Sequence, residues 1–146
     1  MPTDKASQTI TVEAPFDRVL ETIRAVETQP EWIKEILAVD LLEEYEDGSP
    51  ATASFSASSP VGTDRYTLAY EHTGDGMSWH LVKGRLQTGQ DGRYTVRRKG
   101  AHRAEVTFEL QISHNLPLPR FIRSRVIEGL VSSTVTGLKA YAEAQS

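Results

Sequence analysis

The clearest pattern along the chain is an alternation of apolar and polar residues from position 104 to position 112. Even positions carry apolar side chains and odd positions carry mainly polar ones. Because successive side chains of a strand point to opposite faces, the segment predicts a strand with one covered and one solvated face. The apolar residues of this strand are Val106, Phe108, Leu110 and Ile112.

Shorter segments repeat the same alternation, and turn-forming residues separate them at regular intervals. Strands are predicted at 9–13, 53–57, 66–70, 77–81 and 94–96. The predicted turns contain Gly, Pro, Asp or Ser and lie at 47–50, 59–62, 74–76, 90–92 and 99–100. Short alternating runs between evenly spaced turns indicate an antiparallel meander.

Helical spacing replaces the alternation in two places near the N-terminus. Pro15 is suited to the first position of a helix, and apolar residues follow at helical spacing up to about Ala25. A second short helical piece is predicted from Glu31 to Ile36, where Trp32 and Ile33 are also apolar.

One long helix is predicted from Pro117 to Glu143. A helix with no second helix beside it must pack on the sheet, because it cannot bury its own apolar face. The predicted fold is therefore α+β: a curved antiparallel sheet of about seven strands around a long C-terminal helix, with two short helices after the first strand. The broad apolar face of the long helix contains Ile127, Leu130, Val131, Thr134, Val135, Leu138 and Tyr141.

Small residues form a band beside this apolar face, and they include Gly129, Ser133 and Gly137. A glycine inside a helix costs about 1 kcal/mol relative to alanine, so two glycines in one helix require an explanation. They either allow the helix to approach the sheet closely or leave volume for a ligand between the two layers.

Composition narrows the class of protein. The 146 residues suit one domain, 1–146, with 38% hydrophobic and 25% charged residues. No run is long enough to cross a membrane, and the polar N-terminus is unlike a signal peptide. There is no cysteine, and we expect a cytoplasmic protein. A net charge of −4 argues against nucleic acid as a partner. The oligomeric state stays open, with a homodimer as one option.

The order of these segments resembles the helix-grip fold of the START-like (SRPBCC) superfamily. The stretch VEAPFDRV at 12–19 is similar to its opening strand and helix start, and QPEW at 29–32 to its second helix. MSWHLV at 77–82 resembles the strand with its recurrent tryptophan. LPLP at 116–119 and LK at 138–139 resemble the two ends of its final helix. The local matches favour the polyketide cyclase/dehydrase-like and coenzyme Q-binding-like branches.

The resemblance implies a protein that binds or transports a hydrophobic small molecule, such as a lipid, polyketide or quinone-like compound. The ligand would lie between sheet and helix. An enzyme alternative is a polyketide cyclase or dehydratase acting on a poly-ketone chain in the same cavity. A third class is a partner-binding module whose cavity is filled by its own side chains.

The candidate ligand-binding residues are those whose side chains should point between sheet and helix. They come from the inward-facing positions of the alternating strands and from the apolar face of the long helix. Tyr70 and His72 are the candidates for catalysis, because a phenol can orient a carbonyl and an imidazole can move a proton near neutral pH. The histidines show no metal-ligand spacing, so no metal site is expected, and no cofactor either. The predicted lining comprises Phe55, Tyr66, Leu68, Tyr70, Trp79, Tyr94, Phe108, Arg123, Ile127, Val131 and Thr134.

Arg120 and Arg123 lie at the start of the long helix, where positive charge is mildly unfavourable. Two explanations remain open from the sequence. The arginines either bind an anionic ligand headgroup at the cavity entrance, or they lay their aliphatic stems along the apolar edge with their charges in water.

Overall fold

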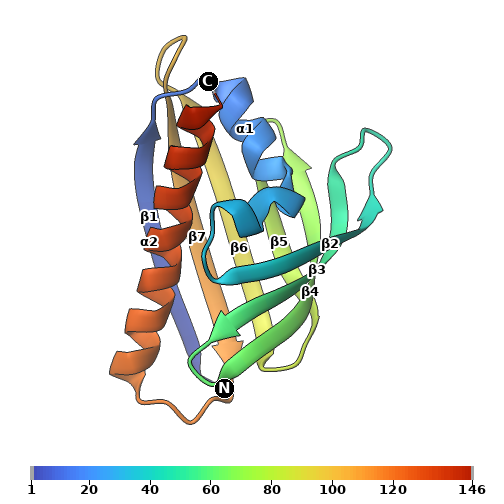
Figure 1. Ribbon diagram of the computed structural model, residues 1–146, viewed down its shortest axis with the longest axis vertical. Coiled ribbons are helices and arrows are strands. Elements are labelled where there is room, and N and C mark those ends of the chain that lie inside the picture. Colours follow the sequence, from blue (N-terminus) through green and yellow to red (C-terminus); the bar gives the residue numbers. More distant parts are fainter. Residues whose placement is uncertain (1, 146) are drawn as a thin grey trace.

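A computed structural model describes residues 2–145 as a seven-stranded antiparallel sheet that curves around one long helix (Figure 1). Every neighbouring pair of strands is antiparallel, in the order β1-β7-β6-β5-β4-β3-β2. The strands are β1 (Thr3–Val12), β2 (Ile36–Glu44), β3 (Pro50–Ser59), β4 (Gly62–Thr73), β5 (Gly76–Gly84), β6 (Gln87–Arg98) and β7 (Ala104–His114).

The chain crosses from one edge of the sheet to the other before the meander begins. β1 forms one edge, and helices α1 (Phe16–Arg24) and η1 (Val26–Glu31) lead to β2 at the opposite edge. The meander then returns strand by strand until β7 pairs with β1, from Thr3 opposite Ser113 to Val12 opposite Ala104. α1 and η1 cover one end of the concave face, as Figure 1 shows.

The predicted inward parity is present across the sheet. Large side chains on the concave face lie directly opposite one another: Phe55 and Tyr66 in β3 and β4, and Tyr94 and Phe108 in β6 and β7. Aromatic rings in neighbouring strands therefore come into contact, and they form the centre of the apolar core.

The turn predicted at 90–92 is wrong, because β6 runs without interruption through these residues. The chain reverses instead between Gly84 and Gln87. Gly92 is needed inside the strand because the indole of Trp79, its partner in β5, fills the space of a side chain. A Cβ at Gly92 would lie 2.1 Å from Trp79 Cζ2.

The second helix is displaced relative to its prediction. The helical segment is a 3₁₀ helix at Val26–Glu31, whereas a helix was expected at Glu31–Ile36. Trp32 and Ile33 are buried, but they lie in the turn that follows η1, and Ile36 is the first residue of β2. Short apolar spacing is compatible with a helix face and with a buried turn, so periodicity alone could not decide.

The long helix α2 spans Arg120–Ala144 and begins three residues later than predicted. The reason is Pro119, which disfavours helical geometry at Leu118 and itself forms the N-cap with extended backbone angles. Within residues 2–145, no helix is long and apolar enough to cross a membrane.

α2 packs tightly in its C-terminal half and loosely in its N-terminal half. Val135, Leu138 and Ala142 are fully buried. Gly137 faces the backbone of Trp32, and a Cβ there would lie 1.8 Å from the Trp32 carbonyl oxygen. At Gly129, eight residues earlier, a Cβ would meet no atom within 4 Å. One glycine therefore permits close packing, whereas the other borders open space.

The edge strand β2 is irregular. Its pairing with β3 shifts register between Ile36 and Ala38 and twice more between Leu41 and Glu44. Such bulges bend a strand and increase its local twist.

The two helical glycines give opposite predictions for the same substitution. Gly137→Ala forces a methyl group against the Trp32 carbonyl, so the free energy of unfolding should fall by about 2 kcal/mol or more. Gly129→Ala meets no neighbour and should raise it by up to about 1 kcal/mol through helix propensity. Urea denaturation of both variants measures the difference, and equal effects would contradict the packing described here.

Candidate functional site

A cavity of about 420 Å³, here called the outer cavity, lies between the N-terminal half of α2 and the sheet. Its walls come from both layers, from the loop before α2 and from the turn between β5 and β6. The apolar side chains of the lining are Ile36, Ala57, Pro60, Tyr66, Leu86, Ile112, Leu116, Leu118, Val126, Ile127 and Leu130. The polar side chains that line it are Asp4, Glu35, Ser58, Ser59, Asp64, Gln87, Gln90, His114, Arg123 and Arg125.

Deeper between the layers, aromatic rings fill most of the space and leave a cavity of about 50 Å³, here called the inner pocket. The rings of Phe55 and Tyr66 are stacked with centroids 5.3 Å apart. Those of Tyr94 and Phe108 are stacked at 4.7 Å. Tyr66 lines both cavities, as do Ile36, Gln90 and Leu130.

The structure brings most of the predicted lining residues together, in two separate places. Arg123 and Ile127 line the outer cavity. Val131 lines neither cavity and is a core residue at 2% exposure. The eight that surround the inner pocket are Phe55, Tyr66, Leu68, Tyr70, Trp79, Tyr94, Phe108 and Thr134.

Three tyrosines, two on β4 and one on β6, bring their phenol groups into the interior. Burial raises the pKa of Tyr94, and it raises the pKa of Tyr66 with a smaller contribution from the negative charge of Asp64. Burial raises the pKa of Tyr70 further, with smaller contributions from Tyr66 and Tyr94. All three phenols are therefore neutral at physiological pH and can donate a hydrogen bond.

A charged cluster joins three elements at the rim of the outer cavity. His114 Nε2, at the end of β7, donates to Asp4 Oδ2 of β1 at 3.0 Å. The backbone N–H of Leu116 donates to His114 Nδ1, so both ring nitrogens are occupied. Arg123 Nε of α2 lies 3.4 Å from Asp4 Oδ2, an ion-pair distance without hydrogen-bond alignment. Asp4 thus has two partners, and the guanidinium of Arg123 is already paired within the protein.

A hydrogen-bonded chain of side chains runs from the inner pocket to the outer cavity. Trp79 Nε1 donates to Gln90 Oε1 at 2.8 Å, and Gln90 Nε2 donates to Gln87 Oε1 at 2.6 Å. Gln87 Nε2 then donates to Asp64 Oδ2 at 3.0 Å. The sequence interpretation missed this chain because it placed Gln90 in a turn. Asp64 shares the inward parity of Tyr66, which is the signal that could have identified it.

His72, one of the two catalytic candidates, is not among the residues that line either cavity. Its Nε2 is 2.7 Å from the carbonyl oxygen of Pro50, and its ring packs edge-on against Tyr45. Its Nδ1 is buried and has no hydrogen-bond partner among the described residues. Tyr70, the other candidate, lines the inner pocket. The rings of the two candidates lie near each other, with centroids 6.5 Å apart, but only Tyr70 lines a cavity.

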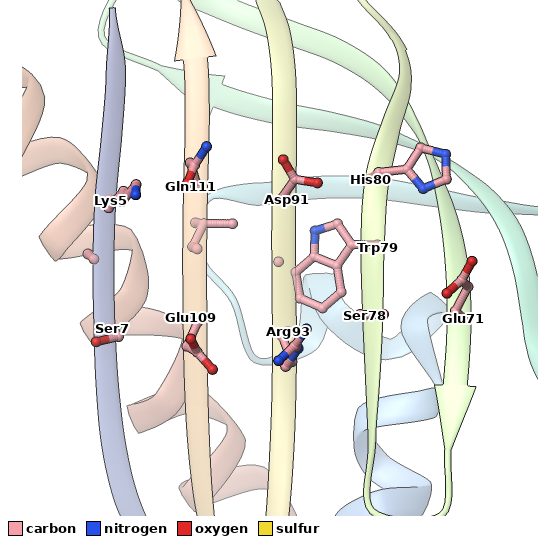
Figure 2. A pocket seen from close by; sticks show the side chains of 13 residues that line it. Lys5, Ser7, Glu71, Ser78, Trp79, His80, Asp91, Arg93, Glu109 and Gln111 are labelled. Carbon is pink, nitrogen blue, oxygen red and sulfur yellow. The ribbon is translucent and has the colours of Figure 1, made fainter.

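A second hollow, of about 660 Å³, lies on the opposite face of the sheet and is shown in Figure 2. It is shallow and open to solvent, and it is lined mainly by polar and charged side chains from β1, β4, β5, β6 and β7. His80, Asp91 and Arg93 are among them. Although this hollow is the larger of the two, it offers little apolar surface to a hydrophobic molecule, so the outer cavity is the better candidate site.

Metal ligands do not gather in the part of the chain that the structure describes. Within residues 2–145, no three His, Cys, Asp or Glu side chains are placed to hold one ion. The polar groups of the outer cavity are therefore considered as hydrogen-bonding groups.

The buried tyrosines predict a stability loss in alkali. Because the pKa values of Tyr66, Tyr70 and Tyr94 are raised in the folded state, the unfolded chain releases these protons first. Their contribution to the free energy of unfolding is complete below pH of about 10 and is lost as pH rises above it. Ultraviolet titration of the phenols alongside circular dichroism should show them ionising only as the protein unfolds. Reversible ionisation of all five tyrosines near pH 10 in a folded protein would contradict this.

No protein-family model matches the chain, and no curated protein matches it. Solved structures, in contrast, match nearly the whole chain. A START superfamily protein from Mycobacterium smegmatis is 19% identical with a TM-score of 0.89, over 97% of this chain and 99% of that one. The Zhui aromatase/cyclase from Streptomyces sp. R1128 is 14% identical with a TM-score of 0.85, over 99% and 96%. A STAR-related lipid transfer protein from Xanthomonas axonopodis is 17% identical with a TM-score of 0.74, over 94% and 85%. The chain shares the helix-grip fold of these three structures.

Proposed function

We propose that the protein binds a hydrophobic small molecule in the outer cavity, between the sheet and the N-terminal half of α2. The observation that carries the proposal is a cavity of about 420 Å³ with apolar walls from both layers. Small-molecule sites are typically concave, largely apolar and about 300–1,000 Å³ in volume, with a few polar groups that fix orientation.

The cavity favours a ligand-binding protein over a module whose interior is filled by its own side chains. Only the inner pocket, at about 50 Å³, resembles such a filled interior. The outer cavity is roughly eight times larger, and a glycine, Gly129, is among its lining residues. Its apolar surface would have to remain hydrated without a ligand, at a cost of about 25 cal/mol per Å².

A carrier or binding role accounts for the site more simply than catalysis does. His114 and Arg123 are engaged by Asp4, and His72 does not line the outer cavity. A ligand in the outer cavity would therefore meet apolar walls and oriented hydrogen-bonding groups. It would not meet Tyr70 or His72, the two catalytic candidates. In this role the protein would bind or transport a lipid, polyketide or quinone-like compound.

One observation supports the alternative of a polyketide cyclase or dehydratase. The neutral phenols of Tyr66, Tyr70 and Tyr94 converge on the inner pocket, where they could donate hydrogen bonds to a carbonyl as it becomes an enolate. The Zhui aromatase/cyclase shares the fold. Turnover of a poly-ketone substrate that is lost in Tyr70→Phe, in a variant that remains folded, would favour this alternative.

Native mass spectrometry of the freshly purified protein, followed by solvent extraction, is the direct test of the proposal. A retained lipid, polyketide or quinone-like compound is the expected result. Failure to retain any compound, together with failure to bind added hydrophobic probes, would contradict it.

A cavity-filling substitution tests the location. Gly129 lines the outer cavity and a Cβ there meets no atom within 4 Å, so the larger side chain of Gly129→Leu should lower the affinity for the neutral fluorescent probe N-phenyl-1-naphthylamine about tenfold or more. Glu128→Leu adds a similar side chain to the preceding exposed position, which does not line the cavity, and should leave the affinity unchanged. Equal affinities for both variants would place the probe elsewhere.

A further inference from the structure

Asp64 is a carboxylate on the concave, apolar face of the sheet. It belongs to the inward series of β4 with Tyr66, Leu68 and Tyr70, is only 4% exposed, and lines the outer cavity. Burying a carboxylate is unfavourable unless partners offset the loss of water. The groups that hydrogen-bond to Asp64 therefore determine whether its charge is compensated inside the proposed ligand site.

The partners of Asp64 are neutral hydrogen-bond donors. The backbone N–H of Leu86 donates to Oδ1 and Gln87 Nε2 donates to Oδ2, each at 3.0 Å. Among residues 2–145, no Lys, Arg or His forms an ion pair with Asp64. Asp4, the other aspartate of the cavity, is paired with both His114 and Arg123. The negative charge of Asp64 is thus the less compensated of the two.

Asp64 is the final acceptor in a chain of hydrogen bonds that begins at Trp79. An indole N–H can only donate, so Trp79 determines the orientation of the Gln90 amide, and Gln90 in turn determines that of Gln87. Gln87 then presents its N–H group to Asp64. A carboxylate has about four acceptor sites, and two are used, so Asp64 can accept another hydrogen bond.

The aromatic wall lies next to this acceptor. Tyr66 is two residues from Asp64 on the same face of β4, lines both cavities and stacks on Phe55. The Asp64 charge also contributes to the raised pKa of Tyr66, so the two groups are near each other. A flat ring that carries a hydroxyl group could therefore lie against this wall and donate to Asp64, whereas a carboxylate would be repelled.

We propose that the outer cavity selects neutral aromatic molecules bearing a hydroxyl group over carboxylic acids such as fatty acids, and that Asp64 accepts the hydrogen bond from this hydroxyl. The inference rests on the proposed function and adds the chemical class of its ligand.

Three probes of one shape test the selectivity of the unmodified protein: 2-naphthol, 2-methylnaphthalene and 2-naphthoate. At neutral pH the first is an uncharged donor, the second has no polar group and the third is an anion. Equilibrium dialysis should show that 2-naphthol binds about tenfold more tightly than either of the others. Comparable affinities for all three, or tighter binding of 2-naphthoate, would overturn the inference and leave the proposed function intact. Binding of none of them would overturn the inference, and it would overturn the proposed function too if the purified protein also retains no compound.

The variant Asp64→Asn tests whether this residue causes the preference for 2-naphthol. The amide retains the shape and can still accept a hydrogen bond, but it has no charge. The tenfold preference of 2-naphthol over 2-naphthoate should therefore largely disappear. Asp91→Asn makes the same change on the outer face of the sheet and should leave the preference intact. If Asp64 only secures the turn at Leu86, Asp64→Asn will lower the melting temperature with unchanged selectivity, and the inference fails. If that variant does not fold, the three-probe comparison on the unmodified protein still decides it.

Discussion

The close contact between α2 and the turn at Trp32 determines how the two layers of the molecule meet. Gly137 allows the helix backbone to reach the Trp32 carbonyl, and fully buried residues follow on the same helix. A rigid helix held tightly at one end of a curved sheet cannot follow the sheet at the other end. The outer cavity lies beside the N-terminal half of α2, and the space from the inner pocket to this cavity is here called the wedge.

Polar groups are distributed unevenly along this wedge. Its closed part contains stacked aromatic rings and neutral phenols, and its open part contains the carboxylates, amides and Arg123. Internal hydrogen bonds orient most of these open-end groups, including Gln87, Gln90 and His114. A ligand entering the wedge would therefore meet polar groups whose directions are already determined, which lowers the ordering cost of binding.

Alternation and turn spacing were sufficient to predict the architecture, because a strand that is covered on one side must alternate and because one long helix must pack on the sheet. The same parity predicted the aromatic residues around the inner pocket. The turn at 90–92 was wrong because Gly92 makes room for the Trp79 ring, a contact between two strands that no local pattern contains. The size of the outer cavity was beyond prediction for a related reason. It depends on how closely the helix approaches the sheet: Gly137 permits close contact, whereas a Cβ at Gly129 would meet no atom within 4 Å.

The irregular pairing of β2 has a consequence for the behaviour of the protein in concentrated solution. An edge strand exposes unpaired backbone N–H and C=O groups, onto which a strand of another molecule can add. The register shifts along β2 interrupt the straight, evenly spaced row that such addition requires. β2 therefore forms a poor template for edge-to-edge aggregation, although it ends an otherwise continuous seven-stranded sheet.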